Sequence, residues 1–436
     1  MRTTISLLLL VAVHAAAQSG APPQLSRRGS AGVAVAAEES QVIVRGVLPG
    51  LPAAKAGLQG GDVLLKLDDV AVASVGDFVS RIGSKKPGDT ARVEYSRNGQ
   101  TATATITIEE RPREQSEVYD VAYGAVTDGT YRYRTISTKP KNAAPVATLF
   151  LVQGLGCGSI DNPPPGHSYR KLIESLTRRG FATLRVDKPG TGDSEGGPCS
   201  AVDFHGEVKA YRAALESLKN EKNVFLLGHS MGGIQAPLIA AGFPVRGVIV
   251  YGATYNSWGN YIVANTRRQQ RLRGESFETI AETEKRNEAF NALFYVQKQP
   301  LEKILAEHPE FRAMFPDGKT LTAGKEGKYF QQLYDVDLAK AWKALNTPVL
   351  ALYGGSDFLT DASEHEWLAA AINSWRPGTA KFVKLDGVDH WLLKTADQAA
   401  SLRQAGEGEY DDRFGETVAA FMNEQLTPRP AAPPAP

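Results

Sequence analysis

Short apolar runs alternate with stretches of helical periodicity between about residues 145 and 425. The runs have the length of strands and are Val146–Val152, Phe181–Asp187, Asn223–Leu227, Gly247–Tyr251, Pro348–Tyr353 and Ala380–Leu385. Segments between them, such as Tyr169–Arg178 and Phe204–Leu218, repeat apolar residues at helical spacing. This alternation predicts an α/β fold with a doubly wound, mainly parallel sheet covered by helices on both faces. Residues 117–138 alternate polar and apolar positions and are expected to add antiparallel strands at the sheet edge.

Before residue 111 the pattern is shorter and richer in strands. It predicts a small β-rich domain over residues 28–111, followed by a second domain over residues 115–426, and a length of 436 residues fits two domains. Asn98-Gly99 is a strong hairpin signal because both residues tolerate positive φ. A helix is predicted from Ser74 to Ile82, with Ser74 as its N-cap. The predicted strands are Gln41–Val47, Asp62–Leu67, Thr90–Arg97 and Gln100–Ile108.

The stretch Val47–Val72, and above all Pro52–Asp62, carries a family resemblance. It resembles a PDZ domain of the kind fused to exported bacterial proteases. The resemblance implies that backbone N–H groups of one loop hold the C-terminus of a peptide while that peptide adds as a strand. This loop would consist of Gly29, Ser30, Ala31, Gly32 and Val33. The alternative is a module that only packs against its neighbour and binds no partner.

The two ends of the chain have compositions unlike those of a folded domain. Residues 1–17 combine Arg2, a short apolar stretch and small residues before Gln18, as a signal peptide does. Residues 428–436 are Pro-rich and predict an extended, disordered tail. We therefore expect an exported protein, either periplasmic or secreted. After residue 17 no apolar run approaches the roughly 18 residues of a membrane span.

The charge balance argues against nucleic acid or an anionic membrane surface as a partner. Lys and Arg number 49 against 48 Asp and Glu, which leaves a formal net charge of +1. Hydrophobic residues make up 42% of the chain and charged residues 22%, which excludes a mainly disordered protein. The sequence contains no Cys/His cluster with metal-ligand spacing, so no metal site is predicted.

A candidate nucleophile lies in the sequence Gly228-His229-Ser230-Met231-Gly232, a G-x-S-x-G motif. By itself the motif is common, but here it follows the apolar strand Asn223–Leu227 and opens into a segment that can be helical. A sharp strand-to-helix turn needs small residues beside the nucleophile, because the backbone there is strained. Ser230 is therefore the predicted nucleophile.

A serine nucleophile needs a base, and His390 is the best placed of the seven histidines. It follows the strand Ala380–Leu385 by a short loop, at the end of the sheet where open α/β folds present their sites. The others have more ordinary explanations. His14 falls in the signal segment, and His229 is expected to point away. His365 is expected to lie on a helix surface, His308 in a polar helical stretch, and His167 and His205 at the periphery.

Asp357 is the predicted carboxylate that orients the base. It follows the strand Pro348–Tyr353 through a short glycine loop, again at a strand end. Asp361 is the next candidate, although it has the position of a helix start, while Asp386 and Asp389 are expected to shape the loop before His390.

The ordered motifs around Ser230, Asp357 and His390 resemble the α/β-hydrolase family over residues 115–426. The resemblance implies an oxyanion hole formed by two backbone N–H groups, those of Leu155 and Met231, with Gly156 as the next choice for the first. Family members commonly have His-Gly where this chain has Gln153-Gly154. Residues 254–345 are too long for a simple connection and are expected to form a helical cap.

Cys157 and Cys199, the only two cysteines, fall in loops expected at the same end of the sheet. In an exported protein they are predicted to form a disulfide that ties the two loops together, the alternative being two free thiols.

Together these features predict a serine hydrolase that cleaves a small-molecule ester or acyl substrate through an acyl-enzyme, without a cofactor. The ester class rests on family analogy. One alternative is a peptidase on the same fold, in which an acidic cap residue such as Glu278, Glu282 or Glu284 holds a free amino terminus. Another is a binding protein led by the PDZ module, with a hydrolase fold that has no catalytic role.

Overall fold

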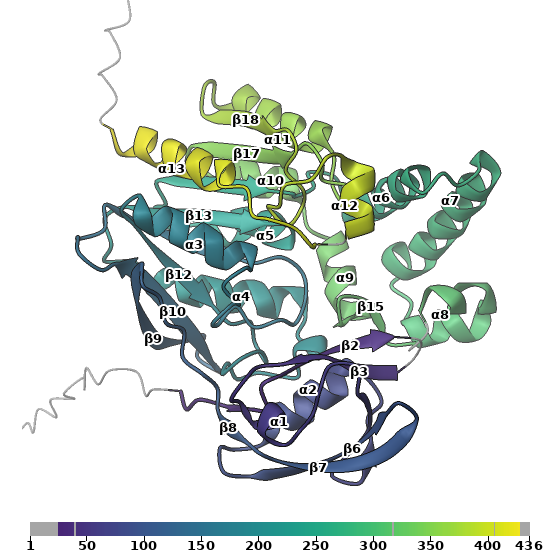
Figure 1. Cartoon of the computed structure of the whole chain (residues 1–436). Helices are drawn as coiled ribbons and strands as arrows, with labels where there is room; N and C mark the ends of the chain where they lie inside the picture. The colour runs from purple at the N-terminus through teal and green to yellow at the C-terminus, as the bar shows by residue number, and fades with distance from the viewer. Residues whose placement is uncertain (1–24, 39–40, 316–317, 405, 428–436) are drawn as a thin grey trace, which may run out of the picture.

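The computed structural model describes residues 25–38, 41–315, 318–404 and 406–427. A small β-rich domain lies against one end of a larger α/β domain (Figure 1). The predicted signal peptide and Pro-rich tail lie outside the described residues. Within the described residues, no helix is long and apolar enough to cross a membrane.

The N-terminal domain is a twisted antiparallel sheet with two helices. Its strands are β2 (Val33–Glu38), β3 (Gln41–Val47), β4 (Val63–Leu67), β5 (Val70–Ala71), β6 (Thr90–Arg97) and β7 (Gln100–Thr107), in the order β2-β3-β4-β6-β7 with β5 beside β4. Asn98 and Gly99 both have positive φ and join β6 to β7, so the predicted hairpin is confirmed. The helices are α1 (Pro52–Lys55) and α2 (Val75–Ser84), and α2 is capped by Ser74 as predicted.

The chain enters and leaves this domain at one place, where β1 (Gly29–Ser30) pairs with β8 (Glu109–Glu110). Arg27, just before β1, is buried and bonds to the carboxylates of Asp161 and Asp193 in the larger domain. The backbone N–H of Arg28 also donates to Asp193, at 2.9 Å. These contacts attach the small domain to loops of the large one.

The larger domain is built on an eight-stranded sheet in the order β18-β17-β14-β13-β11-β12-β10-β9. Six strands are parallel, namely β11 (Ala147–Val152), β12 (Phe181–Val186), β13 (Val224–His229), β14 (Gly247–Tyr251), β17 (Val349–Gly354) and β18 (Ala380–Leu385). The edge strands β9 (Tyr119–Thr127) and β10 (Arg132–Pro140) are antiparallel. The predicted parallel sheet and its antiparallel edge are therefore confirmed.

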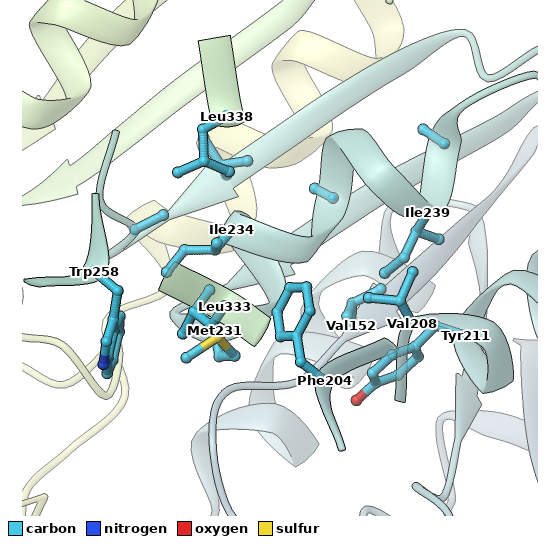
Figure 2. Packing of buried hydrophobic residues seen from close by; sticks show 14 of the residues in the cluster. Val152, Phe204, Val208, Tyr211, Met231, Ile234, Ile239, Trp258, Leu333 and Leu338 are labelled. Carbon is cyan, nitrogen blue, oxygen red and sulfur yellow. The ribbon is translucent and has the colours of Figure 1, made fainter. Parts of the chain in front are cut away.

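Helices cover both faces of this sheet, because alternate strand residues point to opposite sides. Leu149 and Leu151 of β11 pack in one core with α3 (Ser168–Arg178) and α13 (Arg413–Leu426). Phe150 and Val152 pack in the other core, with α4 (Phe204–Glu216), α5 (Met231–Ala240) and α11 (Ala362–Trp375). Figure 2 shows part of the second core, in which Val152, Val208 and Ile239 pack close to Phe204.

The segment between β14 and β17 forms a mostly helical layer beside the strand ends. It contains α6 (Trp258–Leu272), α7 (Phe277–Asn291), the π-helix η2 (Ala292–Val296), α8 (Leu301–Glu307), the 3₁₀ turn η3 (Pro309–Met314), the hairpin β15 (Thr320–Thr322) and β16 (Lys325–Glu326), α9 (Gly327–Tyr334) and α10 (Leu338–Ala344). Side chains of Ser257 and Ser276 cap α6 and α7. Phe290, Phe294 and Tyr295 are buried among these elements.

Candidate active site

Ser230 lies on a tight turn between β13 and α5. Its backbone has φ 55° and ψ −122°, a strained conformation for a residue with a side chain. Added Cβ atoms on the flanking glycines would lie 2.3 Å from backbone oxygens, that of Gly228 from the oxygen of Gly232 and that of Gly232 from the oxygen of Val152. Only glycine fits at these two positions, so the motif has the steric form of a nucleophile turn.

Asp357 and His390 meet at the ends of β17 and β18. His390 Nδ1 lies 2.8 Å from Asp357 Oδ2, and the carboxylate is fully buried. The backbone N–H groups of Leu359 and Thr360 donate to Asp357 Oδ1, at 2.7 and 3.1 Å. Burial opposes ionisation of Asp357, but the attraction of His390 and the hydrogen bonds from His390 and Thr360 hold the pKa of Asp357 well below its usual range.

Ser230 and His390 line one cavity. Among the hydrogen bonds of the described residues, none joins the Ser230 hydroxyl to the His390 imidazole. Such bonds are often long without substrate and tighten only in the reacting complex. The structure thus brings the three sequence-predicted residues to one place and pairs two of them directly.

His229 does not point away from the site, which corrects the expectation from sequence. Its Nε2 lies 2.8 Å from the backbone oxygen of His390, and its Nδ1 lies 2.5 Å from the hydroxyl of Tyr169. The Tyr169 hydroxyl in turn accepts the N–H of Gly154 at 3.3 Å. Burial, and then the charge of His390, lower the pKa of His229 to about 3. His229 is therefore a neutral link between the loop after β11 and the backbone of His390.

His365 is not on a helix surface, and that expectation was also wrong. It is 1% exposed; its Nδ1 donates to the Asp361 carbonyl at 3.0 Å, and its Nε2 accepts the N–H of Ala253 at 3.2 Å. Burial lowers its pKa. The sequence did hold a signal, because His365 shares a helical face with buried Leu368 and Ile372. As expected, Asp361 is the N-cap of α11.

Leu155 and Met231 line the same cavity as Ser230. No hydrogen bond among the described residues uses the backbone N–H of either residue, whereas the N–H of Gly154 is taken by Tyr169. Both predicted oxyanion donors are therefore available. Lys188 holds the loop that contains Leu155 through the carbonyl oxygen of Gly154, at 2.6 Å.

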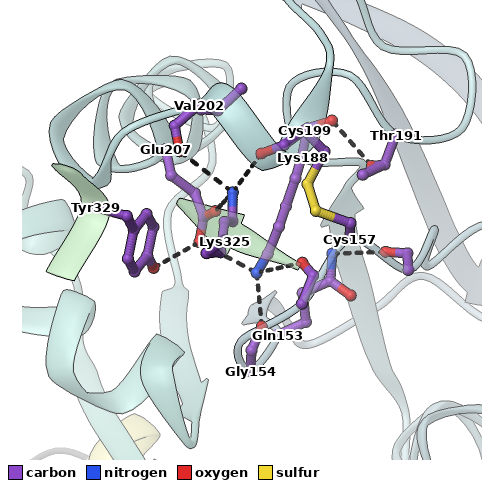
Figure 3. The surroundings of a disulfide bond; sticks show 12 residues. Gln153, Gly154, Cys157, Lys188, Thr191, Cys199, Val202, Glu207, Lys325 and Tyr329 are labelled. Atoms are coloured by element: carbon purple, nitrogen blue, oxygen red, sulfur yellow. Dashed lines mark hydrogen bonds and ion pairs between the residues drawn. A yellow bond between two sulfur atoms is a disulfide. The ribbon is translucent and has the colours of Figure 1, made fainter. Parts of the chain in front are cut away.

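Cys157 and Cys199 form a disulfide (Figure 3), with Cα atoms 5.8 Å apart. The prediction of this bond is confirmed. It joins the loop after β11 to the loop after β12, so the two loops cannot separate.

The cavity has a volume of about 700 Å³ and lies between the strand ends and the cap. Its walls include the apolar or aromatic side chains of Trp258, Tyr261 and Ile262 and the amides of Asn265 and Gln269. No Asp, Glu, Lys or Arg is among the described residues that line it. The acidic cap residues that sequence suggested for a free amino terminus, Glu278, Glu282 and Glu284, are not part of this lining. In the described part of the chain, no group of three or more His, Cys, Asp or Glu side chains is placed to hold a metal ion.

In the small domain, the loop predicted to hold the C-terminus of a peptide leads into an edge strand. Gly29 and Ser30 form β1, Ala31 is buried, Gly32 has φ +67°, and Val33 begins β2. Among the described strands, β2 has only β3 as a neighbour, so its other edge is unpaired. Helix α2 packs beside β2.

Two family models match this chain. The model described as serine aminopeptidase, S33 (Hydrolase_4) matches residues 164–394, which is more than half of the sequence. The chain belongs to this S33 family of α/β hydrolases. A PDZ-domain model matches residues 29–108, so the S33 hydrolase carries an N-terminal PDZ domain.

Each of the individual relatives below is similar to only part of this S33 hydrolase. Esterase EstD of Thermotoga maritima is 23% identical over 290 residues, which cover 65% of this chain and 64% of EstD, so the chain spans less than two thirds of that relative. Serine protease Do-like HtrA of Lactococcus lactis subsp. cremoris is 46% identical over 67 residues, 15% of this chain and 16% of HtrA. The solved structure of Est1E from Butyrivibrio proteoclasticus with ferulic acid is 17% identical, with a TM-score of 0.44, and covers 69% of this chain and 98% of that one.

Proposed function

We propose that this S33 hydrolase cleaves carboxylic esters of small, uncharged molecules, with Ser230 as nucleophile, His390 as base and Asp357 as the residue that orients His390. The observation that carries the proposal is the cavity, since Ser230 on its strained turn and His390 line one space without charged walls. Behind this wall, His390 is paired with the buried Asp357 at 2.8 Å. The name of the relative EstD supports the same class of reaction.

The proposed reaction follows from where the proton can go. Ser230 Oγ attacks the ester carbonyl while its proton passes to His390 Nε2, and Asp357 stabilises the imidazolium that forms. The N–H groups of Leu155 and Met231 donate to the developing oxyanion. His390 then protonates the departing alkoxide, which leaves an acyl-enzyme on Ser230. A water molecule, deprotonated by His390, hydrolyses this ester and restores the serine.

The composition of the cavity wall favours an ester over a peptide with a free amino terminus. An aminopeptidase must hold a cationic amine, and a buried ammonium needs a carboxylate partner. The described lining offers none, and Glu284 instead pairs with Arg267. The family description names aminopeptidases, so the peptidase is the second candidate and is tested beside the first.

The PDZ domain is proposed to bind the free C-terminus of a peptide at the Gly29–Val33 loop and the unpaired edge of β2. Export to the periplasm or beyond is proposed from residues 1–17. DegP-like relatives described as probable periplasmic endoproteases match over the PDZ portion and support that location. Binding of the full chain to peptides with free and amidated C-termini would test the first point, since only the free carboxylate should bind.

Labelling with a fluorophosphonate probe tests the nucleophile. The parent protein should label and the Ser230→Ala variant should not. A folded parent that does not label would contradict the proposed enzyme and favour a binding protein. Labelling of both proteins would place the nucleophile at another serine.

Turnover of matched substrates tests the bond that is cleaved. We expect hydrolysis of short p-nitrophenyl esters to exceed that of aminoacyl p-nitroanilides by at least about 10²-fold in kcat/KM, since the cavity lacks a partner for the amine. Equal or greater turnover of the anilide would contradict the ester proposal and favour the peptidase.

A further inference from the structure

The loop after β11 contains residues 153–158 and is called the 153–158 loop below. Three charged side chains are buried directly behind it (Figure 3). Lys188 comes from the loop after β12, Glu207 from α4 and Lys325 from β16 of the cap, and none of the three side chains is exposed. The Glu207 carboxylate bridges the two ammonium groups, at 3.1 Å from Lys188 Nζ and 2.9 Å from Lys325 Nζ. Burial of such charges is strongly unfavourable unless they are paired and hydrogen-bonded. The hydrogen-bond acceptors of each ammonium group therefore indicate which part of the structure that lysine holds in place.

Lys188 directs two of its three donors at the 153–158 loop. Its Nζ lies 2.6 Å from the carbonyl oxygen of Gly154 and 3.2 Å from that of Gly156. These two residues flank Leu155. With Glu207 as the third acceptor, the ammonium group is fully satisfied.

Lys325 uses its donors elsewhere. Besides Glu207, its Nζ lies 3.0 Å from the carbonyl oxygen of Cys199 and 3.5 Å from that of Val202. Both acceptors belong to the segment before α4. The two lysines therefore share one counterion, but only Lys188 contacts the 153–158 loop.

The contact at Gly154 has a direct consequence for the N–H of Leu155. These two groups belong to one planar trans peptide unit, in which the C=O and the N–H point in opposite directions. A bond from Lys188 that fixes the Gly154 carbonyl toward the protein interior therefore fixes the Leu155 N–H toward the cavity. The positive charge also polarises this peptide and makes its N–H a better donor.

From this geometry we propose that Lys188 is a positioning residue, which orients the Leu155 N–H for the oxyanion and is kept charged in the interior by Glu207. The inference rests on the proposed function, because it assigns a purpose to the donor at Leu155. Lys188 itself touches no substrate, since it lies on the far side of the loop and does not line the cavity.

A matched pair of variants isolates this role. Lys188→Met and Lys325→Met each remove one buried ammonium and leave Glu207 paired with the other lysine. Because the remaining pair is charge-balanced in both variants, the cost to folding should be similar. Only Lys188→Met deprives the 153–158 loop of its donor.

The variants are compared in hydrolysis of a p-nitrophenyl ester that the parent cleaves. Loss of one oxyanion donor typically lowers kcat by about 10²–10³-fold. We expect Lys188→Met to lower kcat by about 30-fold or more with KM within about threefold of the parent, and Lys325→Met to keep kcat within about threefold. Equal losses of kcat in the two variants, or a loss in Lys188→Met that appears only in KM, would overturn the proposal. If Lys188→Met does not fold, Lys188→Leu, which also lacks a side-chain donor, replaces it and is compared with Lys325→Leu, with the same expected and overturning results.

A second readout does not depend on activity. Amide hydrogen exchange of the peptide spanning residues 153–158 should be faster in Lys188→Met than in the parent and unchanged in Lys325→Met. Unchanged exchange in both variants would contradict the positioning role, whatever the enzyme's substrate. Failure of Ser230 to label with a fluorophosphonate would contradict the proposed function instead, so the two failures are distinguishable.

Discussion

Two parts of the cavity wall are held in place by different means. The Ser230 turn is formed by one short stretch of chain, because β13 passes directly into α5, and its two flanking glycines have no room for a Cβ atom. The 153–158 loop, which packs beside Ser230 at Gly154, depends instead on partners that lie more than 25 residues away in sequence, namely Lys188 through two hydrogen bonds and Cys199 through the disulfide. Substitutions should therefore damage the turn by adding atoms and the loop by removing contacts.

The largest effect is expected from Asp357→Asn, which acts on Ser230 through His390. The amide cannot stabilise the imidazolium and favours the wrong tautomer, so kcat for the ester should fall by about 10³–10⁴-fold. The buried site is otherwise unchanged in shape, so KM should stay close to that of the parent. Steady-state kinetics of the two proteins would measure both values. A loss below about tenfold would mean that another carboxylate orients His390.

A smaller but still large effect is expected from one added methyl group on the turn. The Cβ atom of Gly232→Ala would lie 2.3 Å from the Val152 oxygen, so the backbone must move and Ser230 with it. We expect at least about 10²-fold slower fluorophosphonate labelling, since misplacement by about 1 Å can cost that much. Gly158→Ala in the 153–158 loop is the control, because its added methyl meets no atom within 4 Å and the φ there is not positive. Equal labelling rates of these two variants would contradict the claim that an added methyl group disrupts the turn but not the loop.

The same difference explains what the sequence could predict. The Ser230 turn, the strands and the hairpin at Asn98-Gly99 are encoded by neighbouring residues, so periodicity and glycine positions were sufficient. Nothing in the sequence distinguishes Lys188, because its partners Gly154 and Glu207 are brought to it only by folding. His229 was placed wrongly for a related reason, since its position beside the motif gives no sign of which buried acceptor it will meet. The burial of His365, in contrast, is indicated by the helical face that it shares with Leu368 and Ile372.

Removal of the disulfide should have a moderate effect, and on stability more than on chemistry. Cys157 and Cys199 close a loop with a sequence separation of 42, and loss of such a bond typically lowers the free energy of unfolding by about 2–4 kcal/mol. In the Cys157→Ser/Cys199→Ser variant, Lys188 still holds the carbonyl of Gly154, so kcat should fall by no more than about tenfold. Urea unfolding and ester kinetics of the variant would separate the two effects. If kcat falls as far as in Lys188→Met while stability is unchanged, the disulfide rather than Lys188 orients the loop.

The smallest effect is expected at His229, which links the 153–158 loop to the backbone of His390, and it concerns the dependence of stability on pH. Its pKa is about 3 in the folded protein, below the value of about 6.5 for an exposed histidine, so the unfolded chain binds more protons between these values. Stability from this group is therefore complete above about pH 6.5 and is lost as the pH falls toward 3. Urea unfolding between pH 4 and 6 would measure the slope of the unfolding free energy against pH. His229→Gln should lower this slope by about one proton, or about 1.4 kcal/mol per pH unit.

Tyr169→Phe is the control, because it removes a hydrogen bond to the same imidazole but leaves the titrating group, so stability should fall while the slope remains. An unchanged slope in His229→Gln would mean that the imidazole already binds its proton in the folded state, and the link between the 153–158 loop and His390 would then be a charged one.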